Sequence, residues 1–396
     1  MNRDRNNFFG KLLDKDHLKH ALNFKMSGLF DGAVHECIFD HRRNAPGRGY
    51  AAPATRKLHL SREHLKYYGK RDQWWSDAFG DVEIFEFFVL ELEGAELIGE
   101  GIVVDRDGNV LLESTIFREK YLQQLRQNHL IYFRGLLPAG SQAGTVISLA
   151  NVLKWNYYHW IMEGIGRLVL LQLGGYLKGD ESLFVGRNPP AYIGDSINFL
   201  FPRYCDRLLV TPPVRSKPRI LVLPSFPYTN NTATRGNDVY LPDVITGINA
   251  MALYRMQGKQ RKPVNLLISR ARTNQRRLLN DDFLIQELAE LKLQRVFLED
   301  LKFAEQVELF YNANIIIAPH GAGLTNILFC DKGTTVIELF PDNRDLGEAI
   351  GPVSISIHLG LTHFFIECET TDEKRQDILV GESTLEQIKQ AVHSTK

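Results

Sequence analysis

The segment Asn156–Leu173 contains polar side chains that could carry out acid–base chemistry. Asn156, His159, Glu163 and Arg167 recur at intervals of three and four residues, which puts them on one face of a helix. A histidine has an ordinary pKa of about 6.5, so His159 can accept a proton at neutral pH, and a carboxylate one turn later can orient it. The same spacing is typical of a solvent-facing polar stripe, so these residues alone leave both interpretations open.

A second group of polar residues follows the strands that we predict in the C-terminal third. Ligands of a parallel sheet bind beyond the carboxyl ends of its strands, and all of these residues occupy such ends. They are Arg270, Arg272, Arg276 and Arg277 after the first strand, Glu299 and Asp300 after the second, Pro319, His320 and Gly321 after the third, and Glu338, Pro341 and Asp342 after the fourth. We therefore expect a charged site at one edge of this sheet.

The sequence PHGAGLTN at 319–326 predicts an anion-binding turn. Gly321 and Gly323 let the backbone approach a ligand closely, and a helix beginning at Ala322 would direct its free N–H groups toward that ligand. Arginine can bind phosphate oxygens through two parallel hydrogen bonds, so the nearby arginines suit a pyrophosphate group. A tight structural turn would use the same glycines, and a single GxG sequence does not decide between the two.

Strands and helices alternate from Pro263 onward. The predicted order is strand Val264–Ser269, helix Asp281–Leu291, strand Arg295–Leu298, helix Lys302–Ala313, strand Ile315–Ala318, a helix from Ala322, and strand Thr335–Leu339. This alternation predicts a parallel, Rossmann-like sheet.

The preceding part of the chain predicts a further α/β unit. Short β-rich runs begin at Glu83, and the polar helix leads to an apolar strand at 219–224, an irregular segment at 225–242 and a helix near Asp243–Met256. The triplet Asp105-Arg106-Asp107 falls between two strand patterns and precedes Gly108. We interpret it as a hairpin turn rather than as the carboxylate pair of a metal site.

Composition and charge indicate a folded protein with an uneven charge distribution. The 396-residue chain is 44% apolar and 24% charged, and its formal net charge is zero. Residues 1–72 nevertheless hold 15 Lys and Arg against 8 Asp and Glu. Such a segment can contact anionic lipid head groups or an acidic acceptor, or it can simply be solvated. Because the four cysteines lie far apart and no run reaches 18 apolar residues, we expect a cytoplasmic protein that could also lie peripherally on a membrane.

Three blocks of sequence resemble the signature blocks of glycosyltransferase family 61. They are NYYHWIMEGIGRL, LLISRARTNQRRLLNDDFLIQEL and LEDLKFAEQVELFYNANIIIAPHGAGLTNILFCDKGTTVIELFP, and the resemblance spans roughly 82–370. This family includes plant xylan-modifying transferases and eukaryotic O-linked N-acetylglucosaminyltransferases. The resemblance implies a GT-B fold, in which two Rossmann-like domains face a central cleft. It also implies a nucleotide-sugar donor and inversion at the anomeric carbon.

The residue pattern and the resemblance together divide the chain into three parts and suggest roles for the polar residues, of which Arg270, Arg276, His320, Gly321, Gly323, Asn326 and Glu338 fall on motif positions of the family. We expect a basic segment 1–80 of unassigned role, an acceptor-side domain 81–258 and a nucleotide-sugar-binding domain 259–396. The expected catalytic pair is His159 and Glu163, and either could be the base. The expected donor-binding residues are Arg270, Arg276, Arg277, Glu299, His320, Gly321, Ala322, Gly323, Asn326 and Glu338, and the expected acceptor-side residues are Asn156, Tyr158 and Arg167.

These expectations describe an inverting, metal-independent glycosyltransferase. The donor would be a UDP-linked sugar, and the acceptor a hydroxyl of a glycan, a lipid-linked glycan or a protein; neither a cofactor nor nucleic acid is expected. An inverting transfer needs a base for the acceptor hydroxyl and positive charge for the departing diphosphate. The chain contains no GxSxG nucleophile elbow, which argues against an α/β-hydrolase, and GAGLTN lacks the third glycine of a dinucleotide-binding motif. A non-catalytic nucleotide- or sugar-binding protein of the same fold is the remaining alternative.

Overall fold

The computed structural model describes most of the chain beyond residue 54. The described residues are 39–40, 45–46, 55–71, 73, 75, 78–85, 87–106, 108, 110–111, 114, 138–151, 153–209, 214–231 and 237–394. Most of the basic segment at 1–72 and Asp107 of the Asp-Arg-Asp triplet therefore lie outside the described residues. Asp105 lies in the predicted turn, because its carbonyl oxygen accepts a hydrogen bond from the Gly108 N–H at 3.0 Å.

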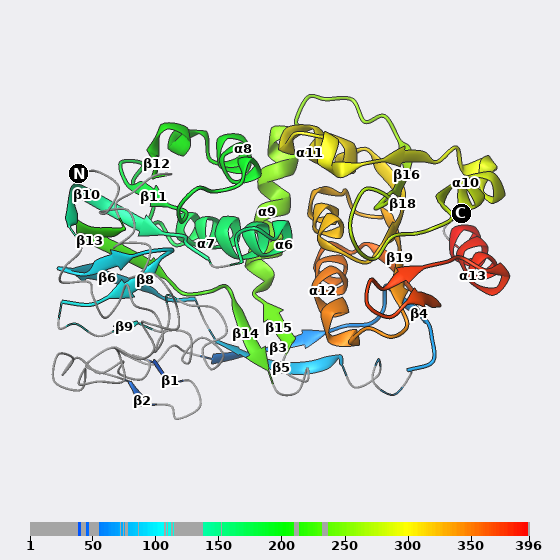
Figure 1. Cartoon of the computed structure of the whole chain (residues 1–396), viewed down its shortest axis with the longest axis horizontal. Coiled ribbons are helices and arrows are strands. Elements are labelled where there is room, and N and C mark those ends of the chain that lie inside the picture. Colours follow the sequence, from blue (N-terminus) through cyan, green and yellow to red (C-terminus); the bar gives the residue numbers. More distant parts are fainter. Residues whose placement is uncertain are drawn as a thin grey trace, which may run out of the picture.

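The first half of the molecule is built on a mixed eight-stranded sheet. Four of its strands run parallel in the order β12, β11, β10 and β13, and antiparallel strands complete it beyond β13 (Figure 1). The strands are β6 (Val89–Glu93), β7 (Glu96–Ile98), β8 (Ile102–Val104), β9 (Val110–Leu111), β10 (Ala139–Ser148), β11 (Ser182–Phe184), β12 (Leu208–Leu209) and β13 (Arg215–Pro224). The β-rich runs that follow Glu83 thus form the antiparallel part of this sheet.

The second half contains a six-stranded sheet in which every pairing is parallel. Its strand order is β17-β16-β18-β19-β20-β4, with β16 (Val264–Ile268), β17 (Gln294–Val296), β18 (Ala313–Pro319), β19 (Thr335–Pro341), β20 (Thr362–Cys368) and β4 (Leu65–Tyr68). The predicted strands and their order along the chain are confirmed. All seven residues of β19 are buried, as expected for a central strand with helices on both faces. The mixed α/β class is therefore confirmed.

Helices cover both sheets and lie between them. The segment from α6 to α7 and helix α8 belong to the first half, and α9 stands between the two sheets (Figure 1). Their bounds are α6 (Tyr157–His159), η3 (Trp160–Ile165), α7 (Gly166–Leu173), α8 (Ala191–Leu200), η4 (Pro202–Arg207), α9 (Pro242–Arg255), α10 (Asp281–Glu287), η6 (Ala289–Leu291), η7 (Leu298–Asp300), α11 (Phe303–Tyr311), η8 (Ala322–Phe329), η9 (Leu346–Ala349), α12 (Ile350–Leu359) and α13 (Glu382–His393).

One hydrophobic core joins the two halves. Buried residues of the first half, such as Trp160 and Leu168, belong to the same cluster as Ile316 and Val336 of the second sheet. Ile248 of α9 lies in this cluster too, so α9 packs between the halves rather than acting as an exposed linker. The halves therefore share buried apolar surface, whereas the division at residue 259 stays a prediction.

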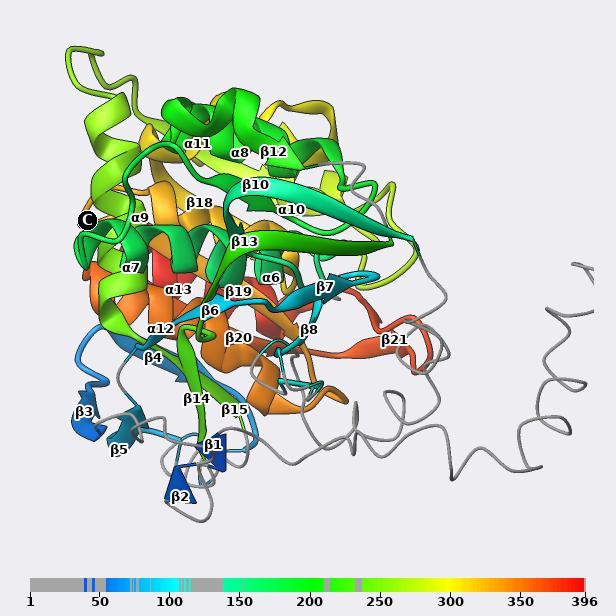
Figure 2. The same ribbon diagram turned by 90° about the vertical axis from the view of Figure 1, so that its left-hand side faces the viewer.

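Several short strands were not predicted. The segment 225–242 contains a hairpin of β14 (Tyr228–Asn231) and β15 (Asn237–Tyr240), so the prediction of an irregular segment is wrong there. Figure 2 shows this hairpin reaching from the first sheet toward β5 (Gly80–Phe85), which pairs with β3 (Thr55–Leu60). The remaining small strands are β1 (Phe39–Asp40), β2 (Ala45–Pro46), β21 (Thr370–Asp372) and β22 (Asp377–Ile378).

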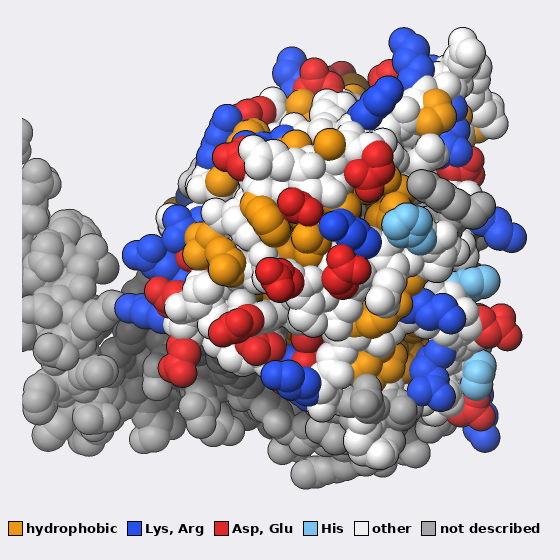
Figure 3. Space-filling model, turned by 90° about the vertical axis from the view of Figure 1, so that its right-hand side faces the viewer, with side chains coloured by type: hydrophobic (Ala, Val, Ile, Leu, Met, Phe, Trp, Pro, Cys, Tyr) orange, Lys and Arg blue, Asp and Glu red, His pale blue; other side chains and the backbone are white. Residues whose placement is uncertain are grey.

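The surface of the second half carries charges of both signs. Figure 3 shows Lys and Arg side chains interspersed with Asp and Glu side chains on the face seen from the right of Figure 1. Among the described residues, no helix combines the length and the apolar character that crossing a bilayer requires.

Candidate functional site

The His159–Glu163 pair lies on a helix that contains a π-helical turn. α6, η3 and α7 follow one another without a break, and η3 is the π-helical part. His159 Nδ1 lies 2.6 Å from Glu163 Oε1, which confirms that the two side chains meet. The Glu163 side chain is fully buried, whereas 18% of the His159 side chain is exposed. Single π-helical turns inside α-helices occur frequently at functional sites.

Neutral donors fix the Glu163 carboxylate. The Tyr240 hydroxyl donates to Oε1 at 3.0 Å, and the Asn151 amide donates to Oε2. A carboxylate only accepts hydrogen bonds, so His159 carries its hydrogen on Nδ1 in this pair. The other ring nitrogen, Nε2, is then the atom that would take up a proton, and the buried carboxylate would stabilise the resulting imidazolium.

The three predicted acceptor-side residues have different environments. Asn156 is exposed, and its side-chain oxygen caps the helix by accepting the Tyr158 N–H at 3.0 Å. The Tyr158 hydroxyl lies over Gly351 of α12, where a Cβ atom would clash with it. Tyr158 thus reaches from the first half onto the second.

Arg167 is buried on the helix of His159. Its side chain is buried and donates to the carbonyl oxygens of Glu163 at 2.8 Å and Leu149 at 2.6 Å. Burial lowers the pKa of the guanidinium to about 10, with Glu163 acting in the opposite direction. The Arg167 guanidinium thus anchors the helix of His159 to backbone carbonyl groups that follow β10, and its acceptor-side role stays a prediction.

The predicted donor site lies where the second sheet changes direction. The chain passes from β16 outward to β17 and then back to β18, and such switch points bind ligands at the carboxyl ends of the strands. Arg270 follows β16, and His320 and Gly321 follow β18. The Arg270 guanidinium covers Gly321 so closely that a Cβ atom there would clash with it. The structure thus brings these residues together.

Arg276 has a strained backbone and an unpartnered side chain. Its φ angle is 56°, in the left-handed region that non-glycine residues seldom adopt, and the Arg270 Nε donates to its carbonyl oxygen at 3.1 Å. Its buried Nε has no hydrogen-bond partner among the described residues. Burial, together with the charges of Arg270 and Arg344, lowers the pKa of Arg276 to about 10. Strain of this kind is concentrated at binding and active sites.

A buried chain of hydrogen bonds holds His320. Its Nδ1 lies 2.5 Å from Glu338 Oε1, and His363 Nε2 lies 3.0 Å from Glu338 Oε2. Ser356 Oγ lies 2.8 Å from His363 Nδ1. Burial alone would raise the pKa of Glu338, but the two histidine hydrogen bonds outweigh it and lower the pKa to about 2. Burial lowers the pKa of His320, with Glu338 opposing.

Sequence reasoning missed His363 and Ser356. Both side chains are fully buried or nearly so, and they complete the chain that begins at His320. The signal available in the sequence was a single histidine within the largely apolar run LTHFFIEC, most of which forms strand β20. A lone polar residue in a buried strand needs a partner, although the sequence cannot say which one.

Two predicted donor-binding residues are engaged elsewhere. Arg277 pairs with Asp377, with 2.6 Å between Nη2 and Oδ2, and this ion pair raises the pKa of Arg277. Asn326 is fully buried, accepts the Tyr157 hydroxyl at 2.7 Å and donates to Gln306 at 2.8 Å. These contacts join loops and halves within the protein, and a role of either side chain in donor binding stays a prediction.

The remaining predicted donor residues surround the turn. Ala322 begins η8, which is a 3₁₀ helix, and a Cβ atom at Gly323 would press on Leu298. Glu299 is exposed on η7, and its charge acts on Arg270, where it opposes the lowering of the pKa by burial. Glu299 therefore borders the arginines, and its role in donor binding stays a prediction.

Arg344 is a further arginine at this site that was not predicted. It follows β19 by three residues, and its charge acts on Arg270, Arg276 and His320. Its side chain contacts Glu348 and Gln376. Its position just after a strand, at the same edge as His320, was the available signal.

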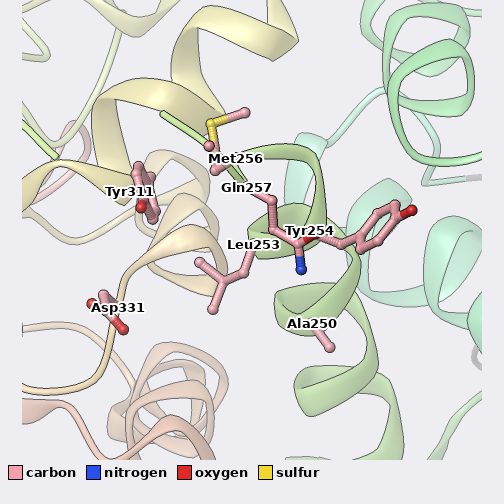
Figure 4. A pocket seen from close by; sticks show the side chains of 8 residues that line it. Ala250, Leu253, Tyr254, Met256, Gln257, Tyr311 and Asp331 are labelled. Carbon is pink, nitrogen blue, oxygen red and sulfur yellow. The ribbon is translucent and has the colours of Figure 1, made fainter. Parts of the chain in front are cut away.

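The described residues contain no group of three or more His, Cys, Asp or Glu side chains that could hold a metal ion. They do form a separate pocket of about 420 Å³ (Figure 4). It lies at the C-terminal end of α9 and is lined by Ala250, Leu253, Tyr254, Met256, Gln257, Gly258, Tyr311 and Asp331. None of the predicted site residues lines it.

Comparison with known proteins finds a family match over the segment that contains His159 and His320. Residues 157–337 match the family model Glycosyltransferase 61. Over 74 residues, the chain is 45% identical to the Mus musculus Protein O-linked-mannose beta-1,4-N-acetylglucosaminyltransferase 2 and 43% identical to that of Homo sapiens. Each alignment covers 18% of this chain and 13% of the relative.

A third relative extends the comparison. The chain is 34% identical over 94 residues to the EGF domain-specific O-linked N-acetylglucosamine transferase of Drosophila melanogaster, which covers 22% of this chain and 18% of that protein. The chain thus spans less than a fifth of the length of each of these three relatives. The family match includes His159, Arg270 and His320, whereas Glu338 and Arg344 lie beyond its end.

Proposed function

We propose that this chain, whose residues 157–337 match the Glycosyltransferase 61 family model, transfers a sugar from a nucleotide-sugar donor to a hydroxyl group of an acceptor. The observation that carries this proposal is the group of arginines at the switch point of the second sheet. Arg270 and Arg276 form no ion pair within the described part of the chain, and both are lowered in pKa by burial and by neighbouring arginines. Partly buried positive charge of this kind favours binding of an anion, and a diphosphate supplies one.

The donor half of the proposal follows from the chemistry of that site. Arg270 lies on the Gly321 backbone at the start of η8, so guanidinium groups and main-chain N–H groups could bind the same phosphate oxygens. Because these cations would offset the charge of the departing diphosphate, we propose transfer without a metal ion. UDP is the proposed nucleotide, and N-acetylglucosamine is the first sugar to test because the relatives' names specify its transfer.

The acceptor half of the proposal assigns the proton transfer to the first half of the molecule. His159 Nε2 would take the proton of the acceptor hydroxyl as that oxygen attacks the anomeric carbon, and the bond to the diphosphate would break. Glu163 would stabilise the imidazolium through Nδ1. A single displacement inverts the anomeric centre. The proposed arrangement is of the GT-B type, with a glycan, lipid-linked or protein acceptor between the halves; a cytoplasmic location with peripheral membrane contact is likewise a proposal.

The test measures donor binding and turnover separately. UDP and UDP-N-acetylglucosamine are titrated calorimetrically into the full chain in the presence of EDTA, and sugar release or transfer is followed with the same protein. Arg270→Gln and Arg276→Gln should each weaken UDP binding by about tenfold or more, since hydrogen bonds to charged groups contribute roughly 1.5–3 kcal/mol.

Arg261→Gln is the matched control. Arg261 precedes β16 at the opposite edge of the same sheet, where it pairs with Asp331 at 3.1 Å, so its loss should leave UDP binding unchanged. Wild-type protein that binds neither ligand would rule out the proposed donor site. Binding without any turnover would instead support a non-catalytic nucleotide- or sugar-binding protein.

A further inference from the structure

We infer that the phosphate site extends beyond the family-matched segment. Arg344 is a third phosphate-binding arginine, and Arg71, which follows the N-terminal strand β4, positions it. This inference rests on the proposed function, because it assumes that the anion is the donor diphosphate. Both residues lie outside 157–337, and Arg71 comes from a segment to which the sequence assigned no role.

The strand order places arginines on both sides of the Gly321 turn. β18, which ends at this turn, lies between β16 and β19 in the sheet. Arg270 and Arg276 come from the loop after β16, and Arg344 comes from the loop after β19. A diphosphate beside Gly321 would therefore be approached by guanidinium groups from two directions, which matches its several charged oxygens.

Arg344 has one guanidinium nitrogen without a hydrogen-bond partner among the described residues. Its terminal nitrogens contact Gln376 and Glu348, whereas its Nε is buried without a hydrogen-bond partner among the described residues. Arg276 has a buried, unpartnered Nε as well. Arg344 pairs with Glu348, but the two unpartnered guanidinium N–H groups and the positive charges acting on each other indicate remaining capacity to bind an anion at this sheet edge.

Arg71 binds the backbone of Arg344, but it is not one of the proposed phosphate-binding arginines. Its Nη1 donates to the Arg344 carbonyl oxygen at 2.6 Å, and its Nε donates to Glu367 Oε1 at 2.8 Å. The Tyr67 hydroxyl donates to the same Glu367 oxygen at 2.6 Å and accepts the Arg71 N–H at 2.8 Å. Any side chain at Gly69 would clash with Tyr67 and Glu367, so this corner is closely packed. Arg71 is therefore a positioning residue.

The experiment titrates UDP into the full chain by calorimetry, with uridine as the phosphate-free comparison. Arg344→Gln should weaken UDP binding by about tenfold or more and leave uridine binding unchanged. Arg71→Gln should have a smaller effect of the same kind, and Arg71→Lys, which keeps a cationic donor, should restore part of it. Lys66→Gln is the control, since Lys66 is exposed on the same strand.

A double-mutant cycle separates positioning from general destabilisation. If Arg71 acts through Arg344, the variant with both glutamines should bind UDP about as weakly as Arg344→Gln alone. Equal loss of UDP and uridine binding in Arg71→Gln would overturn the positioning role. UDP binding by Arg344→Gln at wild-type strength, alongside weakened Arg276→Gln, would overturn this inference and leave the proposed function intact. Failure of the wild-type protein to bind UDP would overturn both.

Discussion

Each half of the molecule holds a histidine whose Nδ1 is bonded to a buried glutamate, and the surroundings of the two pairs differ. In the first half, the Glu163 carboxylate accepts hydrogen bonds from two neutral donors, the Tyr240 hydroxyl and the Asn151 amide, while Arg167 binds the Glu163 carbonyl oxygen. In the second half Glu338 is shared between two histidines, and the charges of Arg276 and Arg344 act on His320.

This difference teaches that a histidine–glutamate pair does not identify a base by itself. A base must become an imidazolium during the reaction, and nearby positive charge opposes that step. The arginines therefore favour a neutral His320, which is less suited to take up a proton during the reaction. His159 contacts a buried carboxylate that two neutral donors hold, so this pair suits proton uptake.

The largest expected effect comes from substitutions in the His159–Glu163 pair. His159→Ala should lower turnover at saturating donor by about 10²- to 10⁴-fold, the usual cost of losing a general base, while UDP affinity stays within about twofold of wild type. Glu163→Gln should lower turnover by the same mechanism, because the imidazolium would lose its counter-charge. Steady-state kinetics and UDP calorimetry on the same preparations measure both quantities.

His393→Ala controls for loss of a histidine, since His393 is exposed on α13. Thermal unfolding of each variant checks that the fold is retained. Turnover above about a tenth of wild type in both His159→Ala and Glu163→Gln would place the base elsewhere in the first half.

A smaller effect tests the second pair through acid stability. The pKa of Glu338 is lowered to about 2 and that of His320 is lowered as well, so the unfolded chain binds more protons at both groups. The free energy of unfolding should therefore decrease as the pH falls from about 6.5, first through His320 and then, below about 4.5, through Glu338. Urea unfolding between pH 7 and pH 4 measures this slope.

Glu338→Gln should lower the free energy of unfolding at pH 7 by an amount on the order of 3 kcal/mol and flatten the acid part of the curve. Glu290→Gln is the exposed control and should change neither quantity. If Glu338→Gln left the free energy of unfolding and its dependence on pH unchanged, the hydrogen bonds from His320 and His363 would not be holding Glu338 ionised.

The smallest expected effect concerns the contact that joins the two halves. Tyr157→Phe removes the hydroxyl that donates to Asn326 at 2.7 Å, which should cost about 1–3 kcal/mol of stability because Asn326 is left with an unsatisfied buried oxygen. UDP affinity should not change, since the two side chains are engaged with each other and Asn326 also donates to Gln306. Tyr254→Phe, at an exposed tyrosine, is the control. A drop in UDP affinity without loss of stability would indicate that Asn326 contributes to donor binding.

The parallel sheet of the second half could be predicted because its pattern is local. Strands such as β19 are buried along their whole length and alternate with helices, so composition alone marks them. The choice between Arg276 and Arg277 could not be made in this way, because the partner of Arg277 is Asp377, 100 residues away. The π-helical turn was hidden for a related reason: intervals of three and four residues fit an α-helix equally well.

Strand β4 has a consequence for the order in which the molecule is completed. Its contact between Tyr67 and Glu367 spans 300 residues, and closing a chain of that length costs about 5 kcal/mol of loop entropy beyond the constant term. During synthesis, β4 emerges long before β20, so it has no partner until most of the chain has left the ribosome. Long-range pairing of this kind folds slowly. The contacts of Arg71 and Tyr67 that support Arg344 are therefore formed late. Until β4 pairs with β20, the sheet has an open edge at β20.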